Sequence, residues 1–410
     1  MPDDPLPHRA ARQPVHTVYG GAHLFTPDTA AKLGAIALRT LRDHAPDAVT
    51  LAAALGLHAP LVERIYPRIV AKLEREPVED YRIDFEDGFG SRPDPEEDDV
   101  AKKAAAHVAA GMKGGTLPPA IGIRIKNLGG ETKRRGLRTF ELFLSALVEA
   151  SGGSLPSNFV VTLPKITGPE QVTTLVEACE AFESSHRLSR GVLTFEVMIE
   201  TPESVFSRDG RIALPEFVSR GQGRIAAAHF GTYDYTASMG ITAAHQNMLH
   251  PSCDFAKHVM QVALSGTDVW MSDGATNIMP VGKDRSVIHA AWKMHADQIR
   301  HSLVGGFYQG WDLHPAQLVT RYAAVFAFFL EGLGPASARL KNFVQKAAQA
   351  TLVGDVFDDA ATGQGLLNYF LRAMNCGAIT EREAVEMSGL SVAELQSRSF
   401  ANILEQRRHS

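Results

Sequence analysis

The sequence predicts an α/β protein built on a (β/α)8 barrel, with a helical insertion after the first strand and a helical C-terminal extension. Eight short runs of β-branched and apolar residues alternate with helical segments. From the second run to the eighth, their starts lie roughly 30 to 45 residues apart, the length of one strand–helix unit. An open doubly wound sheet is the alternative, but Gly20-Gly21 does not form the glycine-rich phosphate turn of that fold.

The predicted strands are separated by segments with helical character. Helices are clearest over Asp99–Met112, which is rich in alanine, over Pro169–Phe182, which opens with proline and glutamate, and over Arg285–Leu303. In chain order the eight strands are expected over His16–Phe25, Tyr81–Asp87, Ala120–Lys126, Phe159–Ile166, Leu193–Glu200, Arg224–Gly231, Val269–Gly274 and Gly306–His314.

Two segments fall outside this period. Residues 26–79 are too long for one connection, and their alanine and leucine content predicts two or three helices. We expect the catalytic barrel to span residues 1–317, with 26–79 as an insertion. We expect residues 318–410 to form a helical C-terminal extension, with breaks at Gly332–Pro335 and Gly354–Gly365.

Composition excludes several classes of protein. The chain of 410 residues has 41 Lys and Arg against 46 Asp and Glu, a formal charge of −5, which does not favour nucleic-acid binding. The longest apolar run, Tyr322–Leu330, is about half of what crosses a bilayer, so no membrane association is expected. Three cysteines without CxxC spacing fit a reducing compartment, and we expect a cytoplasmic protein.

Charged residues gather at the predicted strand ends. In a barrel these ends converge on one mouth, where catalytic groups collect, although a ring of salt bridges closing the mouth is the alternative. Among them, Glu200 and Asp234 end neighbouring strands and would provide two oxygen ligands for Mg²⁺ or Mn²⁺, unless Lys126 and Lys165 simply neutralise them. The remaining charged residues of the set are Asp84, Glu86, Asp87, Arg124, Glu196, Asp273, Asp312 and His314.

Arg124 lies in the alternating run IGIRIK and is expected to bind an anionic substrate through its planar guanidinium. Glu86 and Asp87 would hold water or orient Arg124, or Asp87-Gly88 is only a turn. Asp273, Asp312, His229 and His314 remain open as candidates for the general base, as does a water held by Glu86 or Asp87.

Six motifs in order resemble the HpcH/HpaI aldolase and citrate lyase β-subunit family, over roughly residues 80 to 317. They are Asp84-Phe85-Glu86-Asp87, Arg124, Pro164-Lys165, Ile199-Glu200-Thr201, Phe230-Gly231-Thr232-Tyr233-Asp234-Tyr235 and Leu313-His314-Pro315-Ala316-Gln317. The first strand, the insertion and Asp312 depart from the family pattern, so the chain resembles a divergent branch.

The resemblance implies a Mg²⁺-dependent carbon–carbon lyase that acts on a small 2-oxo or 3-hydroxy acid through a metal-stabilised enolate, and a homo-oligomer. Glu200 and Asp234 would bind the metal. Arg124, Glu86, Asp87 and Asp312 would be catalytic, and Arg124, Lys165, Gly231 and Thr232 would bind substrate. A coenzyme A thioester substrate is possible. Three alternatives stay open: a malate-synthase-like condensing enzyme using an acyl-CoA, a Schiff-base aldolase using Lys165 or Lys126, and a non-catalytic binding barrel.

Overall fold

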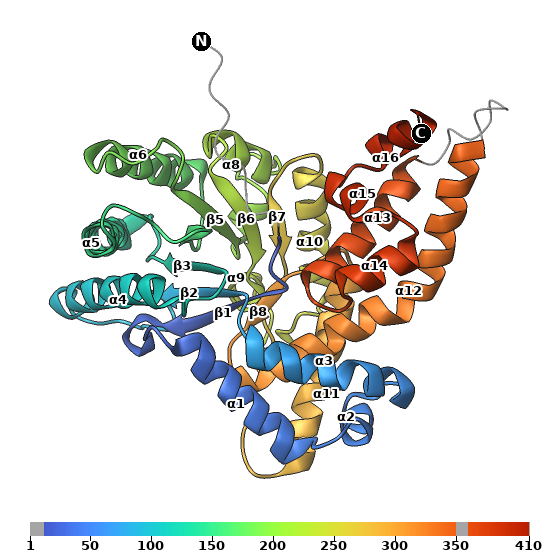
Figure 1. The fold of residues 1–410 in the computed structure, drawn as a ribbon. Helices are drawn as coiled ribbons and strands as arrows, with labels where there is room; N and C mark the ends of the chain where they lie inside the picture. Colours follow the sequence, from blue (N-terminus) through green and yellow to red (C-terminus); the bar gives the residue numbers. More distant parts are fainter. Residues whose placement is uncertain (1–11, 350–359, 410) are drawn as a thin grey trace.

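The protein is described by a computed structural model covering residues 12–349 and 360–409, and its centre is a barrel of eight parallel strands (Figure 1). From β1 to β7 each strand pairs with the next one in sequence, and β1 also pairs with β8. The strands are β1 (His16–Gly21), β2 (Asp80–Asp84), β3 (Ala120–Arg124), β4 (Phe159–Leu163), β5 (Thr194–Ile199), β6 (Ile225–Phe230), β7 (Trp270–Ser272) and β8 (Gly310–Asp312).

Backbone hydrogen bonds bring the last two strands together and nearly close the barrel. The N–H of Asp273 donates to the Gln309 carbonyl at 2.8 Å, and the N–H of Trp311 donates to the Gly274 carbonyl at 3.1 Å. The predicted (β/α)8 barrel is therefore confirmed. The first strand is shorter than predicted, because the chain turns into a 3-10 helix at Ala22–Leu24.

Helices surround the barrel, and several begin and end as the sequence indicates. Proline occupies the first turn of α6, and Gly115 ends α4 in the left-handed conformation. The helices are α1 (Thr29–His44), α2 (Ala48–Leu55), α3 (Ala59–Arg75), α4 (Asp94–Gly114), α5 (Lys133–Ser151), α6 (Pro169–Ser185), α7 (Pro202–Val205), α8 (Leu214–Arg220), α9 (Thr232–Ser238), α10 (Pro251–Leu264), α11 (Arg285–Val304), α12 (Leu318–Gln349), α13 (Ala360–Asn375), α14 (Glu381–Ser388), α15 (Val392–Ser397) and α16 (Phe400–His409).

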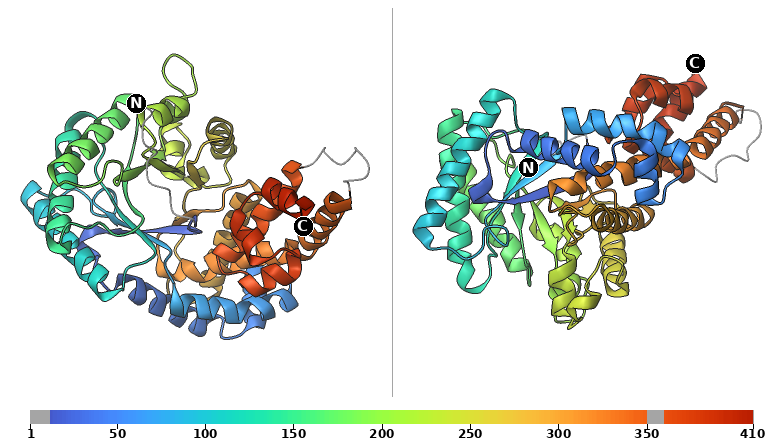
Figure 2. Two further views of the ribbon diagram at one scale, coloured as in Figure 1. Left: turned by 45° about the horizontal axis from the view of Figure 1, so that its top comes forward. Right: turned by 90° about the horizontal axis from the view of Figure 1, so that it is seen from below.

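The segment between β1 and β2 forms the three helices α1 to α3, and α3 packs against α12, so the blue helices lie beside the orange and red ones in Figure 2. The break predicted at Gly332–Pro335 is wrong, because α12 continues through Pro335. Its buried apolar side chains, including Leu333 and Leu340, offset the hydrogen bond that the proline removes. Most of the break predicted at Gly354–Gly365 lies outside the described residues. The proposed boundary at residue 317 stays a prediction.

One helix region, Pro315–Gln345, is long and apolar enough to cross a membrane by composition, but 61% of its apolar window is buried inside the protein. Buried side chains of α12 such as Phe326 belong to the same apolar core as the helices around the barrel. Its hydropathy is therefore accounted for by packing between the barrel and the C-terminal helices.

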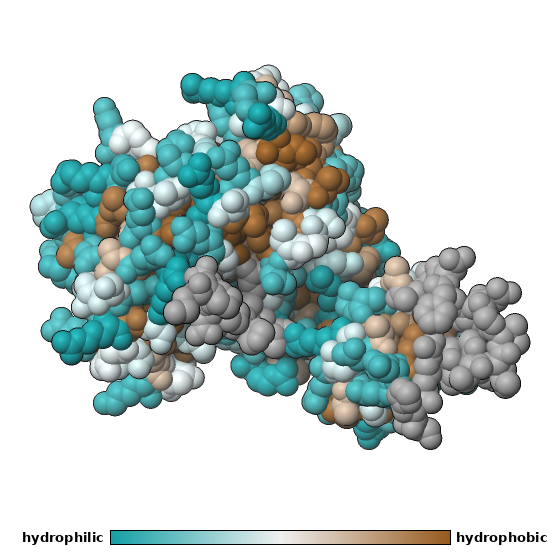
Figure 3. Space-filling view, turned by 90° about the horizontal axis from the view of Figure 1, so that it is seen from above, coloured by the Kyte–Doolittle hydropathy of each residue, from teal (hydrophilic) through white to brown (hydrophobic). Residues whose placement is uncertain are grey.

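Seen from above, the surface is mostly hydrophilic with scattered apolar patches (Figure 3).

The inside of the barrel is polar, and hydrogen bonds cross it between strands that are not neighbours. Arg82 of β2 is fully buried, and its Nη2 donates to Glu196 Oε2 of β5 at 2.7 Å while its Nη1 donates to Asp80 Oδ1 at 2.5 Å. Asp80 in turn accepts from the hydroxyl of Thr17 at 2.9 Å, and Tyr19 OH lies 3.5 Å from Glu196 Oε1. We call Thr17, Asp80, Arg82, Glu196 and Tyr19 the interior column.

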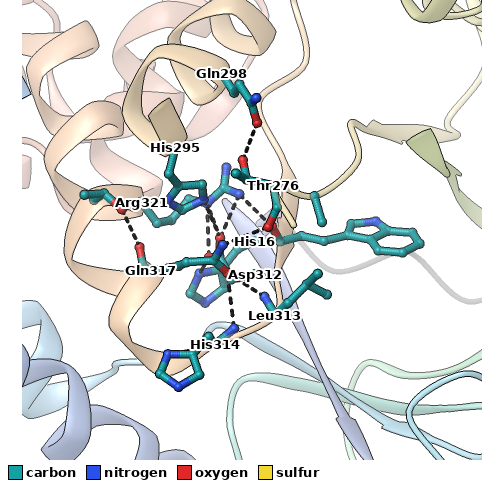
Figure 4. A network of polar contacts seen from close by, with 12 residues as sticks. His16, Thr276, His295, Gln298, Asp312, Leu313, His314, Gln317 and Arg321 are labelled. Carbon is teal, nitrogen blue, oxygen red and sulfur yellow. Dashed lines mark hydrogen bonds and ion pairs between the residues drawn. The ribbon is translucent and has the colours of Figure 1, made fainter. Parts of the chain in front are cut away.

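Asp312 lies outside this column, in a second buried network between β8 and the helices α11 and α12 (Figure 4). Its carboxylate is 2.8 Å from His16 Nδ1 and 3.1 Å from His295 Nε2, and it accepts from Arg321 Nη2 at 2.9 Å. Burial would raise the pKa of Asp312, but Arg321 and the two histidines hold it well below its usual range. With both oxygens engaged, Asp312 anchors β8 to its covering helices, which corrects the expectation of a catalytic role.

This position predicts a pure stability effect for Asp312→Asn. The change leaves the buried Arg321 without its counter-charge, so at pH 7 we expect the free energy of unfolding in urea to fall by about 3 to 5 kcal/mol. The pKa of Asp312 is depressed in the folded protein, so its contribution is present at neutral pH and is lost as pH falls below about 4. The difference between wild type and variant should shrink there. Asp297→Asn, at an exposed surface pair with Lys293, is the control; an equal effect of both changes would contradict the assignment.

Candidate active site

Glu200 and Asp234 meet at the C-terminal ends of β5 and β6. Glu200 is buried, whereas the side chain of Asp234 is partly exposed. Gly231 allows this approach, because a Cβ atom at that position would lie 2.4 Å from Glu200 Cβ. Burial raises the pKa of Glu200 to about 8, and the charge of Asp234 adds to this rise although Lys165 opposes it. The two acidic groups therefore interact at the mouth, where burial and the charge of Asp234 favour the protonated form of Glu200 unless a cation binds between them.

Lys165 connects this pair to the acidic turn after β2. Its backbone N–H donates to Glu200 Oε1 at 2.7 Å. Its ammonium lies 2.5 Å from Glu86 Oε1, 3.1 Å from both Asp87 oxygens and 3.6 Å from Asp234 Oδ2. Burial lowers the pKa of Lys165, but the carboxylates around it outweigh burial and leave that pKa above its ordinary value. The residue has a φ of 49°, a left-handed conformation that costs a lysine roughly 1 kcal/mol or more.

Arg124 is held in one orientation by Asp84. Its Nε donates to Asp84 Oδ1 at 2.7 Å and its Nη2 to Asp84 Oδ2 at 2.5 Å, a bidentate pair of two buried side chains. Asp84 also accepts the backbone N–H groups of Glu86 and Gly88, at 2.9 and 2.7 Å. The sequence places Asp84 in the acidic motif but does not reveal this supporting role.

The remaining guanidinium nitrogen of Arg124, Nη1, faces the turn after β2. It lies 3.4 Å from Glu86 Oε2 and 3.5 Å from Asp87 Oδ2. Burial raises the pKa of Glu86 despite the nearby cations. For Asp87, burial also acts to raise the pKa, but Arg124, a hydrogen bond with Glu86 and Lys165 together outweigh it and lower the pKa. Glu86, Asp87, Arg124, Lys165 and Asp234 thus form one cluster, as the sequence predicts.

Tyr19 packs against Arg124 from inside the barrel, and the sequence analysis did not include Tyr19 among the site residues. The Arg124 guanidinium lies 4.9 Å from the centre of the Tyr19 ring, and the Tyr19 and Trp311 rings lie 4.6 Å apart. Tyr19, Trp311, Met198 and Ala275 form a small apolar cluster of their own, separate from the main core. Because the strands of a barrel are buried on both faces, alternation along β1 and β8 does not indicate that these aromatic rings lie inside the barrel.

Three of the candidates for the general base have their contacts outside this cluster, although Glu86 and Asp87, which could hold a water, lie within it. Because the indole N–H of Trp311 can only donate, His229 Nδ1 accepts it at 3.1 Å, and the protonated Nε2 faces Glu196 at 3.0 Å. Asp273 contacts Lys257 Nζ at 3.0 Å and the hydroxyl of Ser302 at 2.6 Å. His314 Nδ1 accepts the N–H of Ala316 at 3.1 Å. Each of these groups is engaged elsewhere.

The expected substrate contacts at the start of α9 are only partly available. The backbone N–H of Gly231 donates to the Ile199 carbonyl at 3.0 Å, so this group is not free to receive a carboxylate, which corrects the expectation for Gly231. The hydroxyl of Thr232, in contrast, is buried and has no hydrogen-bond partner in the described part of the chain. Gly274 makes room for it, since a Cβ atom there would lie 2.3 Å from Thr232 Oγ1.

The donor set fits a hard divalent cation. A cation between Glu200 and Asp234 would offset both the burial and the repulsion from Asp234 that raise the pKa of Glu200, and carboxylate oxygens are ligands that Mg²⁺ and Mn²⁺ prefer. Over residues 12–349 and 360–409, no three or more His, Cys, Asp and Glu side chains form a group able to hold a metal. Water and substrate would therefore complete the coordination. Lys126 does not compete, because its ammonium donates to Glu97 and to the Phe85 carbonyl.

Solved structures share this fold at low sequence identity. A citrate lyase from Burkholderia xenovorans LB400 is 18% identical, with a TM-score of 0.55 and coverage of 78% of this chain and 91% of its own. The malate synthase of Haloferax volcanii, as a lead(II) complex, is 15% identical, with a TM-score of 0.51 and coverage of 98% and 99%. No curated protein sequence matches the chain. Residues 6–403 match the family described as "Domain of unknown function (DUF6986)", and the chain belongs to that family.

Proposed function

We propose that this protein is a carbon–carbon lyase that depends on a divalent cation and acts on a small 2-oxo or 3-hydroxy acid. The observation that carries the proposal is the convergence of Glu200 and Asp234 with Arg124 and Lys165 at one end of the barrel. Breaking a carbon–carbon bond beside a carbonyl shifts an electron pair onto an oxygen, and the charge that develops there makes up much of the barrier.

In this proposal the cluster neutralises that oxygen and holds the substrate. A divalent ion bound by Glu200 and Asp234 would supply positive charge at the reacting carbonyl. Arg124 presents its Nη1 edge to the same space, since Asp84 occupies its other edge and fixes its plane. Lys165 and the Thr232 hydroxyl would hold the substrate carboxylate, and Glu86 and Asp87 would keep Arg124 and Lys165 in place.

The Schiff-base alternative is less favoured by these contacts. A nucleophilic lysine must lose its proton, which requires a lowered pKa. The pKa of Lys165 is raised by the carboxylates around it, and Lys126 is engaged by Glu97.

A condensing enzyme that uses an acyl-CoA is the second candidate. It would share the same metal site but form the carbon–carbon bond. The similarity to the malate synthase structure extends over 98% of this chain and so includes the C-terminal helices. This similarity in fold supports keeping the condensing enzyme as a candidate.

Replacing either carboxylate should abolish metal binding. For Glu200→Gln and Asp234→Asn we expect loss of saturable Mn²⁺ binding, followed by electron paramagnetic resonance, because each change removes one of two anionic ligands. Glu203→Gln, three residues after Glu200 in the chain, should bind the ion as wild type does. Unchanged affinity in either site variant, with the fold intact by circular dichroism, would remove the metal-site assignment.

Arg124→Lys should retain the charge and lose the bidentate geometry. We expect kcat to fall about 100-fold or more, by analogy with the loss of one oxyanion donor, with a smaller change in KM. Arg138→Lys, at an exposed pair with Asp98, is the matched control. Turnover at the wild-type rate in Arg124→Lys would show that this guanidinium does not act at the reacting oxygen.

A substrate screen separates the reaction classes. We expect cleavage of 2-oxo or 3-hydroxy acids in Mg²⁺ and none in EDTA. Activity that requires an acyl-CoA thioester would favour the condensing enzyme, whereas inactivation by borohydride with substrate in the presence of EDTA would favour the Schiff-base route. Ligand binding without turnover across the screen would identify a non-catalytic barrel.

A further inference from the structure

A cleft of about 610 Å³ lies at the opposite end of the barrel from the candidate active site. Residues just before or at the start of β1, β7 and β8 form one wall, among them Gln13, Trp270 and Tyr308. Helix α13 and the turn before α16 form the other wall, through Arg372 and Arg398. The cleft therefore lies between the N-terminal ends of the barrel strands and the C-terminal helices.

Arg372 is the central feature of this cleft. Its guanidinium carbon lies over the Tyr308 ring, 3.9 Å from the ring centre, and its Nη1 donates to Gln13 Oε1 at 3.1 Å. No carboxylate lies within 4 Å of its nitrogens among the described residues, and burial lowers the pKa of Arg372. The chain thus places a half-buried cation in a cavity without a counter-charge, which is unfavourable unless an anion binds there.

The rest of the lining suits a small organic anion. Arg398 adds a second guanidinium, and Asn368 and Asn375 add amide groups. Trp270, Tyr308 and Phe329 provide apolar surface. Asp268, also in the lining, forms no ion pair with either arginine.

We propose that this cleft is an effector site for a small anion, a carboxylate or phosphate carried by a molecule with a flat apolar part. The anionic group pairs with the free edge of Arg372, and Arg398 completes the positive wall. The apolar part lies against the aromatic side chains of the barrel end.

Hydrogen bonds connect the cleft to the interior column and so to the candidate active site. Gln13, which accepts from Arg372, donates through Nε2 to Gln309 Oε1 at 3.2 Å. Gln309 Nε2 donates to Thr17 Oγ1 at 3.0 Å, and Thr17 begins the interior column. That column ends at Tyr19, whose ring lies beneath Arg124. An anion that draws Arg372 away from Gln13 would therefore act on the first member of a continuous chain.

The binding step is tested by calorimetry on the full chain, with inorganic phosphate and benzoate as separate probes for the two kinds of anion. The titrations are made in a background that carries Arg124→Gln and Lys165→Gln, which removes the two cations proposed to bind anions at the candidate active site. We expect one saturable site, weakened about tenfold or more by adding Arg372→Gln, since a hydrogen-bonded charge pair is lost. Arg64→Gln, an exposed arginine of α3, is the control and should change nothing.

Arg398→Asn keeps the test decisive if the Arg372 variant does not fold. Arg398 is exposed and has a φ of 54°, a conformation that asparagine tolerates, so the fold should persist while affinity falls several-fold. Absence of saturable binding of both probes, or binding that neither Arg372→Gln nor Arg398→Asn weakens, overturns the proposal.

The effector role rests on the proposed lyase function and has its own readout. The probe that binds should change kcat/KM of the wild type and of Arg64→Gln, but not of Arg372→Gln. A probe that binds the cleft but leaves turnover unchanged would overturn the effector role. Absence of any turnover would contradict the proposed function instead, while the calorimetry still decides whether the cleft binds an anion.

Discussion

The ion pairs of Arg82 inside the barrel are the constraint on which the rest of the structure depends. A charge buried on the axis of a barrel must be paired, because water cannot reach it. Arg82 satisfies two carboxylates from different strands, Asp80 and Glu196, and Glu196 in turn fixes Tyr19 and faces His229. The same pairing that fills the interior therefore supports the floor beneath Arg124. Fold and candidate site share this one set of contacts.

Much of the barrel could be predicted from the sequence, because strand and helix patterns alternate with a regular period. The predictions that were wrong concern the ends of strands and helices, because tertiary contacts determine where these elements end. The first strand ends at Gly21 although apolar residues continue to Phe25, and α12 passes through Pro335 because its buried face holds it in place. Propensity along the chain carries no information about either contact. The homo-oligomer and the cytoplasmic location stay predictions.

For the candidate site, the sequence predicts which residues lie at the C-terminal ends of the strands. It does not predict whether their side chains face the barrel axis or the surrounding helices. Strands of a barrel are buried on both faces, so hydrophobic alternation does not distinguish inside from outside. Trp311 and Asp312 are adjacent in β8, yet Trp311 faces the axis and Asp312 faces the helices. Asp312 was therefore expected in catalysis, and Trp311 and Tyr19 were missed. Glu200, Asp234 and Arg124 were chosen from family motifs rather than from alternation along the strands, and their roles at the site stay predictions.

The backbone at Lys165 has an implication for how this region could change. Glycine would adopt the same left-handed turn without strain and could still offer its N–H to Glu200, and asparagine would tolerate the turn nearly as well. Either replacement would relax the loop while deleting the amine. A chain selected for rigidity alone would be expected to drift toward those residues here. Persistence of lysine in related chains would thus indicate that its ammonium, rather than the shape of the loop, is what selection retains.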